Sequence, residues 1–250
     1  MLLRRIPLIA LALLAALTGA PAWAAEAQVA VAANFTEPAK AIAVAFKAQT
    51  GHEAVLSFGA SGQFYTQITK GAPFEVLLSA DAERPQKAEQ EGFAVAGTRF
   101  TYAVGRLVLF SKTPGLVDAK GAVLAGGKFD KLAIADPGAA PYGLAAVETL
   151  KKLNLYDTIK PKIVQGSSIT QAYQFVQTGA AELGFVALSQ VIDDKGGSRW
   201  VVPQADHTAI DQQAVLLKIG ENNPAAIAFM AFLKSPAAVT IIKRYGYEVR

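Results

Sequence analysis

Short apolar runs alternate with amphipathic segments along most of the chain, and this alternation constrains the fold more than any other feature. Apolar runs at 28–33, 53–58 and 76–79 have the length of strands. Between the first two, apolar residues follow the i, i+3, i+4, i+7 spacing of one helix face: Ala39, Ile42, Ala43 and Phe46. A second helix is predicted from about 63 to 70. This β-α-β-α-β order predicts a mostly parallel sheet with helices on both faces.

A second series of the same kind begins at residue 106. Its strands and helices are predicted at 106–110, 132–135, 143–153, 162–164, 170–177 and 183–186. Later strands are predicted at 200–202 and 214–218, and two helices end the chain. Ser235 as N-cap and Pro236 as first helical residue predict the start of the last helix. Two such series predict an α/β protein of two lobes, whose first boundary lies near 103–105.

The N-terminus has the three parts of a secretory signal peptide. Arg4 and Arg5 precede ten apolar residues at 8–17, and Ala22-Trp23-Ala24 supplies small residues for cleavage. Ten helical residues are too few to cross a bilayer core, which takes about 20, so a short membrane anchor is disfavoured. We predict a signal peptide over 1–24, cleaved after Ala24. Without it, 22 basic residues face 20 acidic ones and the formal charge falls from +4 to +2.

Composition excludes several classes of function. The chain has no cysteine, which excludes disulfide frameworks, thiolate metal sites and a Cys nucleophile. It has two histidines, His52 and His207, both in predicted exposed loops, so neither suggests a catalytic base. No run of Lys and Arg with interleaved aromatic residues is present, so nucleic acid is not an expected partner.

Four turns between a predicted strand and the following helix are small or polar and carry no charged residue. In parallel α/β folds, ligands bind outside the carboxyl ends of the strands, where such turns gather. Helix N-termini present unpaired N–H groups and the positive end of the helix dipole, which favour anions. Asn and Ser at these places can instead be simple helix caps. The turns are Ala33-Asn34-Phe35-Thr36, Gly59-Ala60-Ser61-Gly62, Ala140-Pro141-Tyr142-Gly143 and Gly166-Ser167-Ser168-Ile169.

Neutral donors without acceptors predict a particular ligand chemistry. A fully ionised oxyanion needs only donors, whereas monohydrogen phosphate also needs an acceptor for its own hydrogen. The turns therefore favour dianions such as sulfate, molybdate or tungstate. Enzyme motifs fit poorly: Gly59-Ala60-Ser61-Gly62-Gln63 lacks the second glycine of a nucleophile elbow, and no P-loop or dinucleotide fingerprint is present.

Several stretches together resemble a known family, over essentially the whole chain after residue 24. The chain is similar to the molybdate-binding proteins of molybdate ABC transporters, which are type II periplasmic solute-binding proteins. The stretches are Ala32-Ala33-Asn34-Phe35-Thr36, 46–51, Gly59-Ala60-Ser61-Gly62, 71–81, Ala135-Asp136-Pro137, Pro141-Tyr142-Gly143, 182–187 and 243–247.

The resemblance implies a two-lobed type II periplasmic-binding-protein fold with the ligand in the cleft between the lobes. Lobe I would comprise 25–104, with 205–250 returning to it, and lobe II 105–204. The implied function is capture of molybdate, and of tungstate, for delivery to a membrane permease. A receptor for sulfate or another tetrahedral oxyanion remains the alternative, and an enzyme on the same fold is less favoured. The implied protein is a periplasmic monomer without a cofactor.

The resemblance also implies which residues bind the oxyanion, whose metal no protein atom would coordinate directly. Asn34 and Ser61 match side-chain donors, Ala33 and Ala60 stand beside them, and Ile169 matches an aliphatic position that offers its backbone N–H. Tyr142 occupies the position after the proline. The chain departs from many members at Ala187, where they carry a tyrosine donor, and Tyr142 could replace that donor from another side of the site. The expected set is therefore Ala33, Asn34, Ala60, Ser61, Tyr142 and Ile169.

Overall fold

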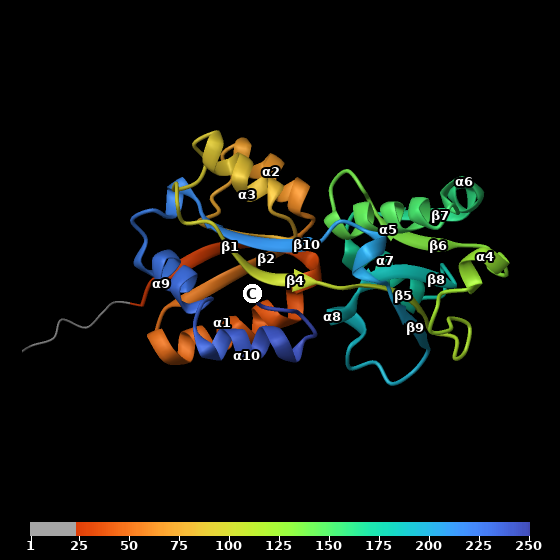
Figure 1. The fold of residues 1–250 in the computed structure, drawn as a ribbon. Helices are drawn as coiled ribbons and strands as arrows, with labels where there is room; N and C mark the ends of the chain where they lie inside the picture. The colour runs from red at the N-terminus through yellow and green to blue at the C-terminus, as the bar shows by residue number, and fades with distance from the viewer. Residues whose placement is uncertain (1–23) are drawn as a thin grey trace, which may run out of the picture.

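A computed structural model describes residues 24–250, which form two lobes side by side (Figure 1). Each lobe contains one five-stranded sheet with helices packed against it. The predicted signal peptide falls on residues 1–23 and Ala24, so all but its last residue lies outside the described part of the chain.

The sheet of lobe I is mixed. Its strand order is β2-β1-β3-β10-β4, and β10 runs antiparallel to both of its neighbours, while β1 is parallel to β2 and β3. The first three strands agree closely with the predicted ones, but β10 begins four residues before the predicted strand. The bounds are β1 Glu26–Ala32, β2 Glu53–Gly59, β3 Val76–Ser79, β4 Phe100–Gly105 and β10 Ile210–Leu216.

The sheet of lobe II repeats this plan. Its order is β7-β6-β8-β5-β9, and β5 is the strand that runs antiparallel to its neighbours. The reversed strands, β10 and β5, are the ones that the chain enters as it passes from one lobe to the other. The sheets are therefore mixed rather than wholly parallel. The bounds are β5 Leu107–Ser111, β6 Leu132–Ala135, β7 Ile163–Gly166, β8 Leu183–Ala187 and β9 Ser198–Val201.

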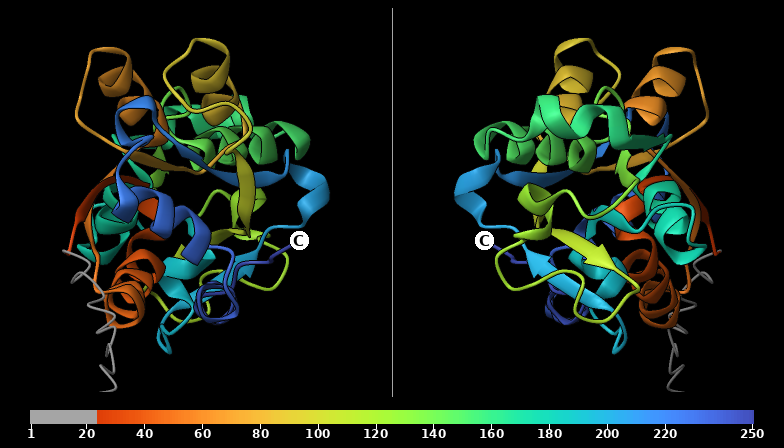
Figure 2. Two further views of the ribbon diagram at one scale, coloured as in Figure 1. Left: turned by 90° about the vertical axis from the view of Figure 1, so that its left-hand side faces the viewer. Right: turned by 90° about the vertical axis from the view of Figure 1, so that its right-hand side faces the viewer.

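Helices cover both faces of each sheet, as Figure 2 shows from two sides. Helix α3 was not predicted, since its sequence is strongly polar and its buried residues are only Pro85 and Ala88. Lobe I carries α1 Thr36–Thr50, α2 Ser61–Thr69, α3 Glu83–Gln90, α9 Pro224–Phe232 and α10 Pro236–Arg244. Lobe II carries α4 Val123–Gly126, α5 Pro141–Lys152, α6 Tyr156–Ile159, α7 Ile169–Gln177 and α8 Leu188–Val191.

The predicted helix face of α1 is part of the core of lobe I. Ile42 and Phe46 are fully buried, and Phe46 packs edge-on against Phe229 of α9 with ring centroids 5.2 Å apart. Helix α1 ends as predicted at Gly51, whose φ of +76° suits glycine and whose N–H donates to the Lys47 carbonyl. The C-terminal helices thus pack on the sheet of lobe I, in which β10 joins four strands from the first 105 residues.

The chain crosses between the lobes twice. The first crossing runs from β4 directly into β5 through Arg106, and the second runs from β9 to β10. The C-terminal tail lies against the first crossing, since Val104 and Glu248 form a β-bridge. Within residues 24–250 no single helix is long and apolar enough to cross a membrane. Helices α9 and α10 reach that length only as a pair bent by 62°, and both pack on the core of lobe I.

Candidate binding site between the lobes

The carboxyl ends of the strands and the starts of four helices meet at a small cavity between the lobes. Lobe I contributes the start of the 3-10 turn Ala33–Phe35 that leads into α1, the start of α2, and Ala80 after β3. Lobe II contributes the first residues of α5 and α7. The lining residues are Ala32, Ala33, Asn34, Gly59, Ala60, Ser61, Ala80, Ala140, Pro141, Tyr142 and Ile169.

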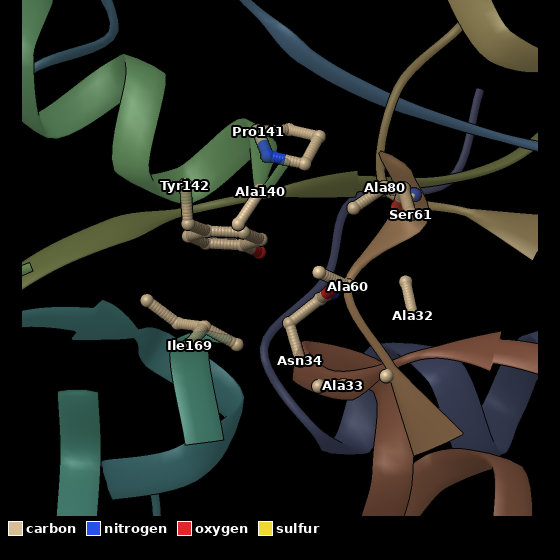
Figure 3. Close-up of a pocket in the computed structure, with 11 residues that line it drawn as sticks. Ala32, Ala33, Asn34, Ala60, Ser61, Ala80, Ala140, Pro141, Tyr142 and Ile169 are labelled. Atoms are coloured by element: carbon tan, nitrogen blue, oxygen red, sulfur yellow. Dashed lines mark hydrogen bonds between the residues drawn. The ribbon is translucent and has the colours of Figure 1, made fainter. Parts of the chain in front are cut away.

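The cavity suits a small ion. About 200 Å³ in it is free of protein atoms, with space open to solvent included, against 550–740 Å³ in four other hollows of the described structure. Tyr142 and Ile169 face Asn34, Ala60 and Ser61 across it (Figure 3). A ligand held here touches both lobes at once.

Ser61 offers its hydroxyl hydrogen to the cavity. It is the first residue of α2 and is 1% exposed. Its Oγ accepts a hydrogen bond of 2.9 Å from the backbone N–H of Ala80. Because a hydroxyl has a single hydrogen and this bond uses only a lone pair, the hydrogen is left for a ligand. The backbone N–H of Ser61, in the first turn of α2, has no partner within the helix.

Tyr142 offers a second hydroxyl from the opposite lobe. It is 1% exposed, and its Oη accepts a hydrogen bond of 3.3 Å from Gln212 Nε2. Its hydrogen is therefore also left for another partner. Burial raises the pKa of the Tyr142 hydroxyl well above its usual value of 10.0, and the neighbouring hydroxyls of Tyr247 and Tyr102 raise it further. Tyr142 thus stays a protonated donor at neutral pH.

The side chain of Asn34 is committed to the protein rather than to a ligand. Its Nδ2 lies 2.9 Å from Gln212 Oε1 and 3.0 Å from Tyr247 Oη and donates to both. Both amide hydrogens are thereby used. The backbone N–H of Asn34, at the start of the helix, is the donor that this residue has left.

The cavity carries no formal charge of its own. None of its lining residues has an ionisable side chain other than Tyr142. Burial also raises the pKa of Tyr247 to about 12, with hydrogen bonds to Ser189 and Asn34 opposing the rise. Within residues 24–250 no group of three or more His, Asp or Glu side chains could hold a metal ion. An anion here would be met by hydrogen-bond donors and helix dipoles alone.

All six residues expected to bind the ligand line this one cavity. Four of them offer no side-chain donor there: Asn34, whose amide hydrogens are used within the protein, Ala33, Ile169 and Ala60, whose N–H is 3.4 Å from Gln63 Oε1. Two further candidates from the same turns, Ser167 and Ser168, are not among the lining residues. The Oγ of Ser168 instead caps α7 by accepting from the N–H of Gln171.

The two histidines lie away from the cavity lining. His52 accepts a hydrogen bond from the N–H of Ala25. The prediction that His207 is exposed is wrong: it is only 9% exposed, although its neighbours in the loop are exposed or half-buried, and its Nδ1 lies 2.7 Å from the Thr208 carbonyl oxygen.

Sequence reasoning missed the buried polar residues behind the cavity. Gln212 is fully buried on β10, Tyr247 lies in the C-terminal tail, and Ser189 is the second residue of α8. The residues are far apart along the chain, and only Tyr247 stood in a stretch that resembled the family. A buried glutamine in a strand is costly unless its amide is hydrogen-bonded, which marks Gln212 as a residue with a role.

Direct contacts hold the lobes together around the cavity. The N–H of Gly62 in α2 donates to the Ala139 carbonyl across the gap at 2.9 Å, and Arg84 Nη2 donates to the Gly138 carbonyl at 3.0 Å. A methyl group at position 62 would lie 3.0 Å from Ala139 Cα, so glycine permits this approach. The lobes are therefore closed on the cavity.

The comparisons with known proteins agree with this geometry. A family described as bacterial extracellular solute-binding protein matches residues 27–248. The chain belongs to this family. The prediction of the family, of its two-lobed fold and of a binding protein rather than an enzyme is confirmed.

Curated relatives carry more specific names. Molybdate-binding protein ModA of Rhodobacter capsulatus is 59% identical over 227 residues, which are 91% of this chain and 90% of that protein. The protein of the same name from Azotobacter vinelandii is 56% identical over 242 residues, 96% of each chain. The solved periplasmic molybdate-binding protein of Azotobacter vinelandii superposes with a TM-score of 0.87 at 44% identity, covering 90% of this chain and 99% of that one.

Proposed function

We propose that this solute-binding protein captures molybdate in the cavity between its lobes and presents it to the membrane permease of an ABC transporter. The observation that carries the proposal is a closed cavity lined by neutral hydrogen-bond donors from both lobes, with no charged side chain. Relatives that cover nine-tenths of the chain and are named for molybdate binding support the choice of this oxyanion.

The ligand is held by hydrogen bonds alone. The hydroxyls of Ser61 and Tyr142 donate from opposite lobes, and the backbone N–H groups of Asn34, Ser61 and Ile169 donate from helix starts. Ala33 and Ala60 shape the wall beside these donors. Molybdenum is bound within its oxyanion and no protein atom coordinates the metal.

Binding and closure are the same event. Since the donors are divided between the lobes, a dianion interacts with all of them only when the lobes are closed, and the ligand thereby favours the closed form. The hydrogen bonds from Gly62 to Ala139 and from Arg84 to Gly138 link the two lobes in the closed form. The permease then receives a closed, loaded protein.

The place of action follows from the N-terminus and from a relative. The protein acts in the periplasm, as the name of the Azotobacter vinelandii protein states for that relative. A signal peptide over 1–24, removed after Ala24, would bring it there. It acts as a monomer, because one chain supplies every donor described above.

Calorimetric titration of the purified protein with molybdate, tungstate, sulfate and phosphate tests the proposal. We expect tight binding of molybdate and tungstate, which excess sulfate does not displace. Phosphate should bind worst near neutral pH, because its hydrogen needs the lone pair of a hydroxyl, which then cannot donate its own hydrogen to the same oxygen. Equal binding of sulfate would contradict the choice of molybdate as the ligand, and no binding of any oxyanion would refute the site.

A further inference from the structure

We propose that Gln212 is a positioning residue for ligand binding, which holds the Tyr142 hydroxyl as a donor toward the bound oxyanion. The proposal rests on the proposed function, since it concerns how the same cavity binds its ligand. Gln212 does not line the cavity. It acts one layer behind it, from strand β10 of lobe I on a side chain of lobe II.

The amide of Gln212 has partners on both of its ends. Its Oε1 accepts from Asn34 Nδ2 at 2.9 Å and from Tyr102 Oη at 3.0 Å. Its Nε2 donates to Tyr142 Oη at 3.3 Å. The side chain is fully buried, so no water competes for these positions and the amide is held in one orientation.

A backbone carbonyl fixes the direction of these hydrogen bonds. The carbonyl oxygen of Asn34 can only accept, and Tyr247 Oη and Ser189 Oγ lie 2.7 and 2.8 Å from it. Tyr247 Oη also lies 2.9 Å from Ser189 Oγ, and its single hydrogen goes to one of these two oxygens, so Tyr247 Oη must accept where it meets Asn34 Nδ2 at 3.0 Å. The side-chain nitrogen of Asn34, and not its oxygen, therefore faces Tyr247 and Gln212.

The direction of the hydrogen bond between Asn34 and Gln212 determines the direction of the next one, between Gln212 and Tyr142. Because Asn34 presents its nitrogen, Gln212 must present its oxygen to Asn34 and its nitrogen to Tyr142. Tyr142 Oη accepts that hydrogen bond, so its own hydrogen goes either to the neighbouring Tyr247 hydroxyl or into the cavity, where a bound oxyanion is the stronger acceptor because it is charged. The opposite orientation of Gln212 would draw the Tyr142 hydrogen inward and turn an oxygen lone pair toward a dianion.

Gly105 makes room for this contact between the lobes. It is the last residue of β4, at the first crossing. A methyl group at this position would lie 2.8 Å from Gln212 Nε2 and closer still to Tyr142 Oη. Since its φ is not in the left-handed region, the backbone itself does not require glycine here. The absence of a side chain serves the approach of Tyr142 to Gln212.

A double-mutant cycle tests the proposal on the full chain with molybdate as the probe. Gln212→Met, Tyr142→Phe and the double variant are titrated by calorimetry, with circular dichroism and thermal unfolding as checks on folding. We expect Gln212→Met to raise the Kd about tenfold in the unsubstituted chain and less than about twofold in the Tyr142→Phe chain. A merely structural role would give equal losses in both, and that result would overturn the proposal.

A second variant keeps the test decisive if Gln212→Met does not fold. Gln212→Leu is a second apolar variant, which gives Tyr142 no hydrogen-bond donor and brings no charge into the buried network. The excess loss of affinity in the chain that retains Tyr142 again isolates the direction of the hydroxyl. We expect an excess of about tenfold, and no excess would overturn the proposal.

Gln213→Met is the matched control. Gln213 is the next residue on β10 and contacts Arg99 and Thr101 instead of the cavity network, so its substitution should leave the Kd unchanged. Failure of the unsubstituted chain to bind molybdate would overturn the proposed function together with this inference. Tight molybdate binding with equal losses across the cycle would overturn the inference alone.

Discussion

Removing the Ser61 hydroxyl should weaken molybdate binding by a predictable amount. In Ser61→Ala the ligand loses one hydrogen bond to a charged acceptor, a bond worth about 1.5–3 kcal/mol. At 1.4 kcal/mol for each factor of ten, the Kd should rise by about 10- to 150-fold. The variant also removes the acceptor for the Ala80 N–H, which lies 2.9 Å from Ser61 Oγ. That N–H faces the cavity, where water can hydrate it in the empty protein.

Calorimetric titration with molybdate, beside Ser57→Ala as a control, measures this loss. Ser57 has the same side chain and lies four residues earlier on β2, away from the cavity lining. Its substitution should leave the Kd within about twofold, as expected for a change remote from the ligand. An unchanged Kd in Ser61→Ala would refute the assignment of this hydroxyl as a ligand donor.

Three further predictions follow from the same contacts. Asn34→Ala should lower the free energy of unfolding, measured with denaturant, by about 1–3 kcal/mol, because Gln212 and Tyr247 lose a buried hydrogen-bond partner; an unchanged free energy of unfolding would contradict the network. Gly62→Ala should weaken molybdate binding in calorimetry while leaving the Tm unchanged or higher, because the new methyl group obstructs the approach to Ala139 but favours the helix; an unchanged Kd would refute the role of this contact in closure. The pKa of Tyr247 is raised from 10.0 to about 12 in the folded state, so its contribution to stability is complete below pH 10 and is lost between pH 10 and about 12; unfolding free energies that stay level over that interval would contradict this.

The sequence pattern predicted those parts of the site that depend on local structure. Ser61 and Tyr142 could be predicted to lie together because each is the first or second residue of a helix after a strand, and the carboxyl ends of parallel strands gather at one edge. The capping alternative for Ser168 proved right, whereas at Ser61 the hydroxyl has no capping bond within α2. A serine at a helix start is thus ambiguous until its neighbours in space are known.

The parts that could not be predicted depend on contacts between distant segments. Strand β10 begins with Ile210-Asp211-Gln212-Gln213, which reads as a polar stretch although buried and half-buried residues alternate along it. Only the antiparallel pairing with β3 and β4 brings Gln212 behind the cavity. Asn34 was expected to donate to the ligand from its side chain. The sequence could not show that this side chain is used within the protein, because its partners, Gln212 and Tyr247, are 178 and 213 residues away in sequence.

A neutral cavity is a reasonable solution for a protein that must also release its ligand. A lysine or arginine in the closed cavity would lose hydration whenever the lobes met without a ligand, at a cost of several kcal/mol. Hydroxyls and helix N–H groups avoid that cost. Ser61 is held by Ala80 within lobe I, whereas the contact of Tyr142 with Gln212 joins the lobes and forms when they close. In the proposed mode of binding the two hydroxyls belong to different lobes, so opening removes Tyr142 from the dianion at once and water can replace it. The same division that makes the closed form bind tightly therefore makes the open form bind weakly, which a carrier requires if the permease is to take the ion.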